Sequence, residues 1–409
     1  EAPSDVGEVV VTGFVDKKRE SYTGATHVIQ RQEIENMVHT NVLNIIQLQT
    51  PGFEIFDDIA NGSDPNKIPD MVLRGRSSFI EGDQTNVPLF ILDGTEVDIS
   101  YVFDMPSDDI ESISVLKDAS ASAIYGAKAS AGVILVTTKK GAAGKATVSY
   151  SNNIGWTQPT TPTDFITNGY DYATIVNDLY FSRYAYNAFN YTDADWAALE
   201  ARRYDTTEHP DRPWVVIGDD GKYPYYGNFD WYGYFYNRVR SQQEHNLSLS
   251  GSTDKVSYYA SGRFYQQYGM FNINKDKFND YAFRTKVSAR IAPWLKYSNN
   301  TSFDTTDYKY GGHQDYEGTI NALQSNICAA FLPYNPDGTI VQYVNQLGKN
   351  SPIGAGRGGQ MTADRSKNTR EKRYLTFSNQ FDVTLFKKLV LTAVYDYRQR
   401  DNLFKYRNN

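Results

Sequence analysis

The sequence lacks the features that mark several common protein classes. It holds one cysteine, Cys328, in 409 residues, which excludes an intrachain disulfide framework and a cysteine-rich zinc site. No apolar run approaches the roughly 18–20 residues that a membrane-spanning helix needs, and the mean hydropathy is −0.55. The net charge is −7 without a basic stripe, so nucleic acid is not expected as a partner. Low hydropathy leaves open a transmembrane β-barrel, whose strands alternate lipid-facing and lumen-facing residues.

Patterns typical of catalytic and metal sites are missing as well. The five histidines are scattered, with no HExxH motif, and the glycine-rich segments contain no phosphate-binding loop. Adjacent carboxylates such as Asp57 and Asp58 point apart on a loop, whereas a glycoside hydrolase needs two carboxyl groups that converge on one bond. Cys328 lies in an apolar stretch, where a thiol usually serves as a small buried hydrophobic residue. We therefore expect no enzyme activity, no cofactor and no metal.

The sequence is rich in tyrosine, and many of its segments alternate apolar and polar residues with a period of two. Tyrosine occurs 32 times, and after Gly144 apolar and polar residues alternate along one segment after another. In one such segment, Tyr258 and Phe264 fall on one face while Arg263 and Tyr265 fall on the other. Comparable segments are found at residues 146–156, 247–249, 281–291, 295–304, 375–385 and 389–398. Charges inside these segments fall on the polar face, as expected for about seven strands of a transmembrane β-barrel.

The lengths of the connections help to distinguish a barrel from a soluble β-sandwich, whose strands also alternate. Tight turns such as 252–254 are expected between some strands. Between others we expect long connections at about 158–240 and 308–371, with a short one near 269–277. Short turns on one side and long loops on the other are typical of a barrel with periplasmic turns and extracellular loops. The aromatic residues between Tyr223 and Tyr236 are interpreted as girdle and loop core in preference to a ligand platform.

Residues 21–144 are expected to form a mixed α/β domain. Apolar residues three and four apart predict helices at 29–38 and 42–49. Strands are expected at 71–76, 88–94, 113–116 and 133–136, the last two joined by a crossover of small residues.

Residues 1–20 are polar apart from one β-branched run. This run, Glu8-Val9-Val10-Val11-Thr12-Gly13-Phe14, could add as a strand to the sheet edge of another protein. The alternative is that it forms an ordinary first strand of the domain that follows.

Four motifs in chain order carry a resemblance to a known family. They are the segments Met71–Arg76, Pro88–Gly94, Asp108–Ala119 and Ala131–Gly141. Together they closely resemble the plug-domain signature of the SusC-like TonB-dependent outer-membrane transporters, and Asn246–Lys255 is similar to the beginning of that family's barrel.

The resemblance implies a fold and a division of the chain. The fold is a transmembrane barrel of about 22 antiparallel strands with an N-terminal mixed α/β plug domain in its lumen. Residues 1–20 would hold the TonB box and a flexible segment, 21–144 the plug, and 145–409 the first part of the barrel. About seven strands cannot close around a plug, so we expect a longer polypeptide or a further chain to complete the barrel. We also expect a removed leader, and the family's usual N-terminal extension domain is not recognisable.

The resemblance also implies a function and partners. The function is active import of oligosaccharides, or of peptides, across the outer membrane of a Gram-negative bacterium of the Bacteroidetes type, with several strands crossing the outer-membrane lipid. The partners would be a SusD-like surface lipoprotein that closes as a lid and TonB, energised by ExbB and ExbD. The alternative is a barrel-anchored surface receptor or adhesion protein that binds without transport. The sequence does not identify the glycan or peptide, or the oligomeric state.

Three sets of site residues follow from these considerations. The TonB box would be Val9, Val10, Val11, Thr12 and Gly13. Polar contacts within the plug or between plug and barrel are expected from Arg74, Arg76, Glu111, Lys117 and Asp118, because an arginine in a plugged lumen must be paired. Substrate contacts are expected from a loop resembling the plug apex and from lumen-facing strand positions: Phe79, Glu81, Asp83, Gln84, Arg263, Tyr265 and Arg284. The alternative for the apex loop is a solvated turn.

Overall fold

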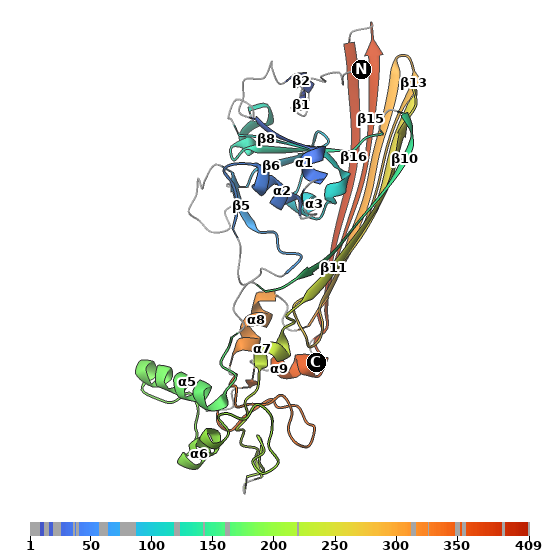
Figure 1. The fold of residues 1–409 in the computed structure, drawn as a ribbon. Coiled ribbons are helices and arrows are strands. Elements are labelled where there is room, and N and C mark those ends of the chain that lie inside the picture. The colour runs from blue at the N-terminus through green and yellow to red at the C-terminus, as the bar shows by residue number, and fades with distance from the viewer. Residues whose placement is uncertain are drawn as a thin grey trace.

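The computed structural model of the chain describes most of its length. The described residues are 9–11, 16–18, 26–35, 37, 41–56, 64–73, 87–117, 123–141, 144–159, 164–218, 221–311, 316–325, 327–347, 352–353, 357–386 and 389–407. Two bodies are built on sheets: a small sheet domain made by residues 26–141, here called the inner domain, and a tall curved sheet, here called the wall (Figure 1). A third body, made by α5 (Gly169–Tyr184) to α9 (Arg357–Thr362) and their connections, lies beyond one end of the wall (Figure 1). The inner domain lies against the concave face of the wall.

The inner domain is built on a five-stranded sheet. Its strands, in spatial order, are β3 (Thr26–Gln30), β8 (Ile110–Leu116), β9 (Val133–Thr138), β6 (Leu89–Leu92) and β7 (Thr95–Val97). All neighbours are antiparallel except β6 and β9, which are parallel. The predicted strands at 113–116 and 133–136 are confirmed. The segment between them joins an antiparallel pair, so the predicted crossover is wrong.

Short helices pack on both faces of this sheet, and both faces are apolar. They are α1 (Arg31–Glu35), α2 (Val42–Gln49), α3 (Ile99–Phe103) and the 3₁₀ segments η3 (Ser107–Asp109) and η4 (Ala123–Ala129). Helix α2 begins at the cap Asn41, whose side chain accepts from the amide of Leu43 at 2.8 Å, and buries Ile45 and Ile46. The predicted helix at 42–49 is therefore confirmed. The predicted helix at 29–38 is wrong in its first part, because Ile29 pairs with Ile113 and is fully buried in β3.

Two small hairpins complete the N-terminal part. One joins β4 (Phe53–Phe56) to β5 (Asp70–Leu73). The other joins β1 (Val9–Val11) to β2 (Asp16–Lys18). The run of valines is therefore a strand whose main chain pairs with a segment of the same chain.

The wall is a seven-stranded antiparallel sheet in which every strand pairs with the next one in sequence. Its strands are β10 (Gly144–Thr157), β11 (Arg240–Ser252), β12 (Val256–Tyr268), β13 (Lys277–Ala292), β14 (Leu295–Tyr310), β15 (Asn368–Leu385) and β16 (Leu389–Lys405). The described strands form one curved sheet and not a sandwich of two. The sheet is open, since β10 and β16 each have one neighbour within the described residues.

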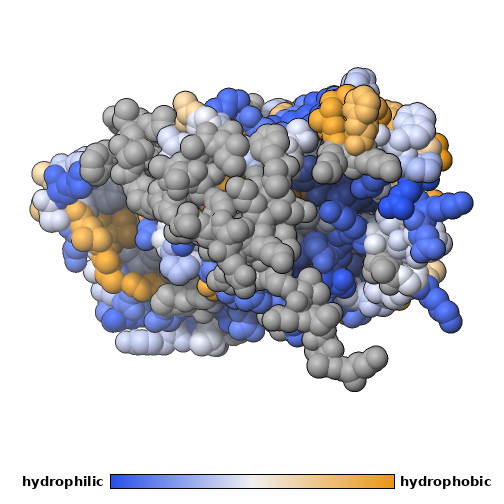
Figure 2. Space-filling model, turned by 90° about the horizontal axis from the view of Figure 1, so that it is seen from above, coloured by the Kyte–Doolittle hydropathy of each residue, from blue (hydrophilic) through white to orange (hydrophobic). Residues whose placement is uncertain are grey.

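The predicted period of two is visible on the wall. Apolar side chains on the convex face are exposed, for example Phe283 at 51% and Leu391 at 52%, whereas Arg284 on the concave face is buried at 2%. Figure 2 looks down on the end with the short turns, where hydrophilic residues surround a hollow and apolar residues form separate patches. This distribution suits a sheet with lipid outside and polar contacts inside.

A row of aromatic rings crosses four adjacent strands on the convex face. Tyr150, His245, Phe264 and Tyr281 follow one another with ring centroids 6.2, 6.2 and 5.2 Å apart, and the Tyr150 hydroxyl lies 2.8 Å from Nδ1 of His245. Amphipathic rings of this kind gather where a membrane protein meets the bilayer interface.

The strand connections differ at the two ends of the wall. Short turns join β11 to β12, β13 to β14 and β15 to β16 at one end. At the other end, the β10–β11 and β14–β15 connections carry the remaining helices, and residues 269–276 join β12 to β13 without a helix (Figure 1). These helices are α5 (Gly169–Tyr184), α6 (Asp193–Ala201), α7 (Trp231–Phe235), α8 (Tyr316–Gln324) and α9 (Arg357–Thr362). Among the described residues, none of the helices has the length and apolar character needed to span a membrane.

Candidate functional site: the interface between inner domain and wall

Ion pairs join the inner domain to the wall, and all of them have the same arrangement of charge. In each of four pairs the inner domain supplies the carboxylate and the wall supplies the cation. They are Asp64 with Arg370 at 3.2 Å, Asp93 with Lys286 at 3.0 Å, Asp104 with Lys372 at 3.2 Å, and Asp109 with Arg284 at 3.2 Å. A fifth pair, Asp98 with Arg400 at 3.6 Å, has the same polarity but is exposed. The interface is therefore electrostatically complementary along several strands of the wall.

Asp93 owes its position to a tight hairpin turn. Asp93 and Gly94 both have positive φ angles, 47° and 88°, which is the backbone of the two-residue Asp-Gly turn that joins antiparallel strands. The turn aims the Asp93 carboxylate at Thr138, whose amide donates at 3.0 Å and whose hydroxyl donates at 2.6 Å. From the wall, Asn300 donates to the same carboxylate at 2.9 Å. Asp93 therefore ties the inner sheet to both β13 and β14.

The environments of Asp93 and Asp104 shift their pKa values in opposite directions. Burial alone would raise the pKa of Asp93, but the Lys286 ammonium and the two hydrogen bonds from Thr138 outweigh it and hold the pKa below its ordinary value. Burial also raises the pKa of Asp104, and there Lys372 offsets it incompletely, so the pKa stays above its ordinary value. Asp93 is thus the more firmly ionised of the two.

Asp109 forms the most deeply buried contact of the interface. It lies in η3, directly before β8, and is 3% exposed. Its carboxylate accepts from the Tyr259 hydroxyl at 2.9 Å and from Arg284 Nε at 3.2 Å. Neighbouring contacts extend the seam: Ser151 donates to Asp108 at 2.5 Å, and the Tyr101 hydroxyl meets Ser302 Oγ.

The predicted contact residues lie in several places. Lys117 donates to the carbonyl of Pro51 at 2.5 Å, a contact within the inner domain. Glu111 is exposed on β8, where its charge acts on Arg31. Outside the described residues are Thr12, Gly13, Arg74, Arg76, Phe79, Glu81, Asp83, Gln84 and Asp118.

The predicted wall positions are all on the concave face and are not equivalent. Arg284 contacts the inner domain, as described above. Arg263 binds two carboxylates of the wall itself, Glu244 at 2.7 Å and Asp280 at 2.7 Å. Tyr265 lies beside Arg263, which places its guanidinium carbon 5.1 Å from the ring centroid. Their roles in binding a substrate stay predictions.

Sequence reasoning missed most of the residues that form the interface. Asp93 and Asp109 lie within motifs singled out above, and Lys286 lies on the predicted polar face, yet none was named as a contact. The sequence feature that could have identified Lys286 is a charge on the polar face of a strand. Such a charge indicates that a buried partner exists, but not which residue it is.

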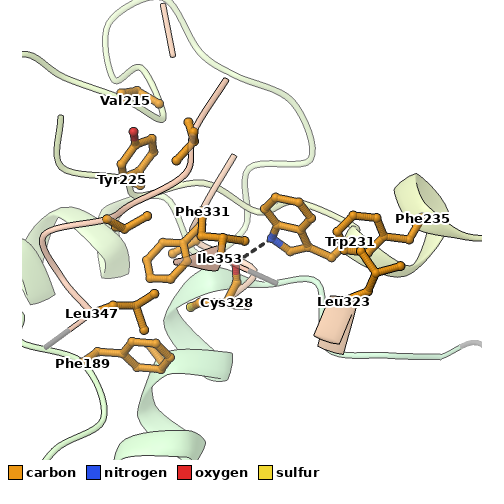
Figure 3. Packing of buried hydrophobic residues seen from close by; sticks show 14 of the residues in the cluster. Phe189, Val215, Tyr225, Trp231, Phe235, Leu323, Cys328, Phe331, Leu347 and Ile353 are labelled. Carbon is orange, nitrogen blue, oxygen red and sulfur yellow. Dashed lines mark hydrogen bonds between the residues drawn. The ribbon is translucent and has the colours of Figure 1, made fainter. Parts of the chain in front are cut away.

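The long connections fold into a separate apolar core beyond the loop end of the wall (Figure 3). Trp231, from the first long connection, donates from Nε1 to the carbonyl of Cys328 in the second at 2.9 Å. Phe331 packs edge-on against Phe189 and Tyr225. The aromatic segment between Tyr223 and Tyr236 therefore contributes to a loop core. Cys328 is fully buried, as predicted.

Comparison with known proteins bears on the identity of both bodies. Residues 18–133 match the TonB-dependent Receptor Plug Domain family. The TonB-dependent receptor SusC of Bacteroides thetaiotaomicron is 31% identical over 210 residues, which are 49% of this chain and 20% of that protein. The chain is similar to the SusC-like TonB-dependent receptors. The inner domain thus corresponds to the matched plug domain.

Other relatives extend the likeness over nearly the whole chain. TonB-dependent receptor P26 of Formosa agariphila is 27% identical over 389 residues, covering 93% of this chain and 33% of that receptor. The RagAB peptide importer in its open-open state has the same fold, with a TM-score of 0.71 and 23% identity over 95% of this chain and 42% of that one. The chain spans about a fifth to a third of the length of the two curated relatives.

Proposed function

We propose that this SusC-like chain takes part in TonB-dependent import of oligosaccharides, or of peptides, across the outer membrane of a Gram-negative bacterium. The observation that carries the proposal is the seating of the inner domain. It lies against a polar concave face, held by ion pairs of one polarity, while the convex face is apolar. A body held by separable polar contacts can block a lumen and still be displaced.

The proposal includes a division of the chain and a complete barrel. Residues 1–20 carry the TonB box, 21–144 are the plug, and 145–409 begin a transmembrane barrel of about 22 strands. Further strands are required because the open edges at β10 and β16 cannot face lipid unpaired.

The partners follow from the two ends of the molecule. A SusD-like lipoprotein would cover the end with α5 to α9, and TonB, energised by ExbB and ExbD, would engage Val9–Gly13 at the other. Support for the first comes from α5, which leaves Ile175, Leu179 and Phe181 exposed. Support for the second comes from β1, which already has strand conformation.

Uptake by whole cells tests the proposal. Replacing Val10 by Pro removes a main-chain donor and should block strand addition, so import of labelled oligosaccharide should stop while binding at the cell surface survives. The control is Val10→Ile, which keeps the donor and the β-branched shape and should import normally. Undiminished uptake by Val10→Pro would favour a surface receptor that binds without energised transport.

A further inference from the structure

A cavity of about 420 Å³ lies between the inner domain and the loop-side ends of β11, β12 and β13. Phe103 and Asp104 line it from the inner domain, and Glu244, Arg263, Tyr265 and Asp280 are among the residues that line it from the wall. Its volume falls in the range of sites for small organic ligands. The wall residues stand at the end of the wall opposite the short turns, so the cavity lies on the side of the inner domain that faces α5 to α9 (Figure 1).

At one place around this cavity, two carboxylates share a single cation. Asp64 and Asp104 line the cavity and have cations of their own, Arg370 and Lys372. Glu244 and Asp280 share the single guanidinium of Arg263. These three residues, here called the triad, carry a net charge of −1 when ionised. Lys67 also lines the cavity, but its side chain is exposed on the inner domain.

One atom of the triad is left without a partner. Asp280 is 3% exposed, and its Oδ2 accepts from Arg263 at 2.7 Å. Its Oδ1 has no hydrogen-bond partner in the part of the chain that the structure describes. A buried carboxylate oxygen without a donor is costly. A cationic donor entering the cavity would supply both the missing hydrogen bond and the missing charge.

The remaining lining favours an organic cation over a metal ion. Tyr265 and Phe278 form an edge-to-face pair with centroids 6.1 Å apart, and Phe103 lines the cavity from the opposite body. Aromatic faces attract organic cations, and Tyr265 already lies beside the Arg263 guanidinium. Among the described residues, no group of three or more His, Cys, Asp or Glu could hold a metal ion.

We propose that this cavity binds a primary ammonium group of the imported solute, with Glu244, Arg263 and Asp280 as the recognition triad. The inference rests on the proposed function, because it assigns a chemical class to the solute that is carried. The ammonium would donate to Asp280 Oδ1 and Glu244 while its carbon stem packs against Phe103 and Phe278. An amino sugar and a lysine-containing peptide both supply such a group.

Calorimetry on the intact protein in detergent tests the inference with matched probes. The probes are the disaccharide of glucosamine, its N-acetylated form, the peptide Ala-Lys-Ala and the same peptide acetylated on the lysine. We expect an amine to bind about tenfold or more tightly than its acetylated counterpart, the loss expected for a hydrogen bond to a charged group. Whether the sugar or the peptide shows the preference identifies the source of the ammonium. Equal binding of amine and acetylated form in both series would overturn the inference, as would binding of sodium ions alone.

Variants assign the effect to the triad. Asp280→Asn and Glu244→Gln keep the side-chain volumes and should each remove most of the preference for the amine. Asp382→Asn, on the same face of β15 near the short turns, should keep it. If Asp280→Asn does not fold, Phe278→Leu tests the aromatic part of the site alone. A preference for amines that survives in both triad variants would contradict the assignment.

The experiments distinguish failure of the amine-binding inference from failure of the proposed import function. Binding of purified protein needs no TonB, so absent amine selectivity with Val10-dependent uptake would reject only the triad. Selective binding without Val10-dependent uptake would reject only energised import.

Discussion

The carboxylate of Asp93 and the ammonium of Lys286 lie 3.0 Å apart, one at the tip of an inner-domain hairpin and the other on strand β13. Each side chain is 17% exposed, so the pair is largely shielded from solvent. Because Asp93 also accepts from Thr138 and Asn300, one carboxylate joins three strands that belong to two separate sheets.

Removing the cation of this pair should weaken the docking of the inner domain. In Lys286→Met the Asp93 carboxylate keeps its hydrogen bonds but loses its counter-charge, which should lower the free energy of unfolding by about 1–3 kcal/mol. Chemical unfolding at pH 7 measures the change. The control is Lys309→Met, because Lys309 is 64% exposed and its pair should contribute under about 1 kcal/mol. Equal effects of the two variants would contradict the role of Asp93.

The opposite pKa shifts of Asp93 and Asp104 predict opposite pH dependence. The lowered pKa of Asp93 gives stability that is present above its ordinary pKa of 3.8 and is lost as the pH falls through the folded value. The raised pKa of Asp104 gives stability that is present below 3.8 and is lost as the pH rises through the folded value. Asp104→Asn should therefore cost less than Asp93→Asn at pH 7. Unfolding of both variants at pH 4 and pH 8 measures this, and a larger cost for Asp104→Asn at pH 7 would refute it.

Arg284 should be the most costly cation of the interface to remove. Its side chain is 3% exposed and pairs with Asp109, whose side chain is 5% exposed, so Arg284→Met leaves a buried carboxylate unpaired. We expect a loss of about 3–5 kcal/mol in the free energy of unfolding. Arg400→Met is the control, because Arg400 is 44% exposed and faces an exposed Asp98. Should Arg284→Met lose substrate binding with unchanged stability, the predicted substrate role would be supported instead.

Cys328 should resist alkylation while the loop core is folded. Burial raises the pKa of its thiol to about 12, so almost no thiolate exists at pH 8. Maleimide labelling should be slow in the native protein and fast after denaturation. Trp231→Phe, which removes the hydrogen bond to the Cys328 carbonyl, should speed native labelling. Ser182→Cys on the exposed end of α5 provides a reactive comparison, and equally rapid labelling at Cys328 would contradict the buried core.

The sequence predicts the wall well because its information is local. Alternation with a period of two places Arg263, Tyr265 and Arg284 on the concave face, and hairpin pairing fixes their neighbours. The partners across the interface are not local: Asp93 and Lys286 come from different sheets, and nothing in either segment specifies the other. Trp231 illustrates the same limit, since its partner Cys328 lies 97 residues away. Ile29 shows a third case, in which strand pairing with Ile113 prevails over a helical spacing.

The exit of the chain from the inner domain has a mechanical consequence. A Cβ added at Gly141 would lie 2.5 Å from the carbonyl oxygen of Gly251 and from the amide nitrogen of Tyr258, so the chain passes in direct contact with the β11–β12 end of the wall. At the other end, β3 has β8 as its one sheet neighbour among the strands that the structure describes. A pulling force applied before Thr26 therefore acts first on the five-residue strand β3. It acts last on the segment at Gly141, which is in contact with the wall. If force is applied there, as the proposed function requires, we expect the first strand to separate while the rear of the inner domain stays attached to the wall.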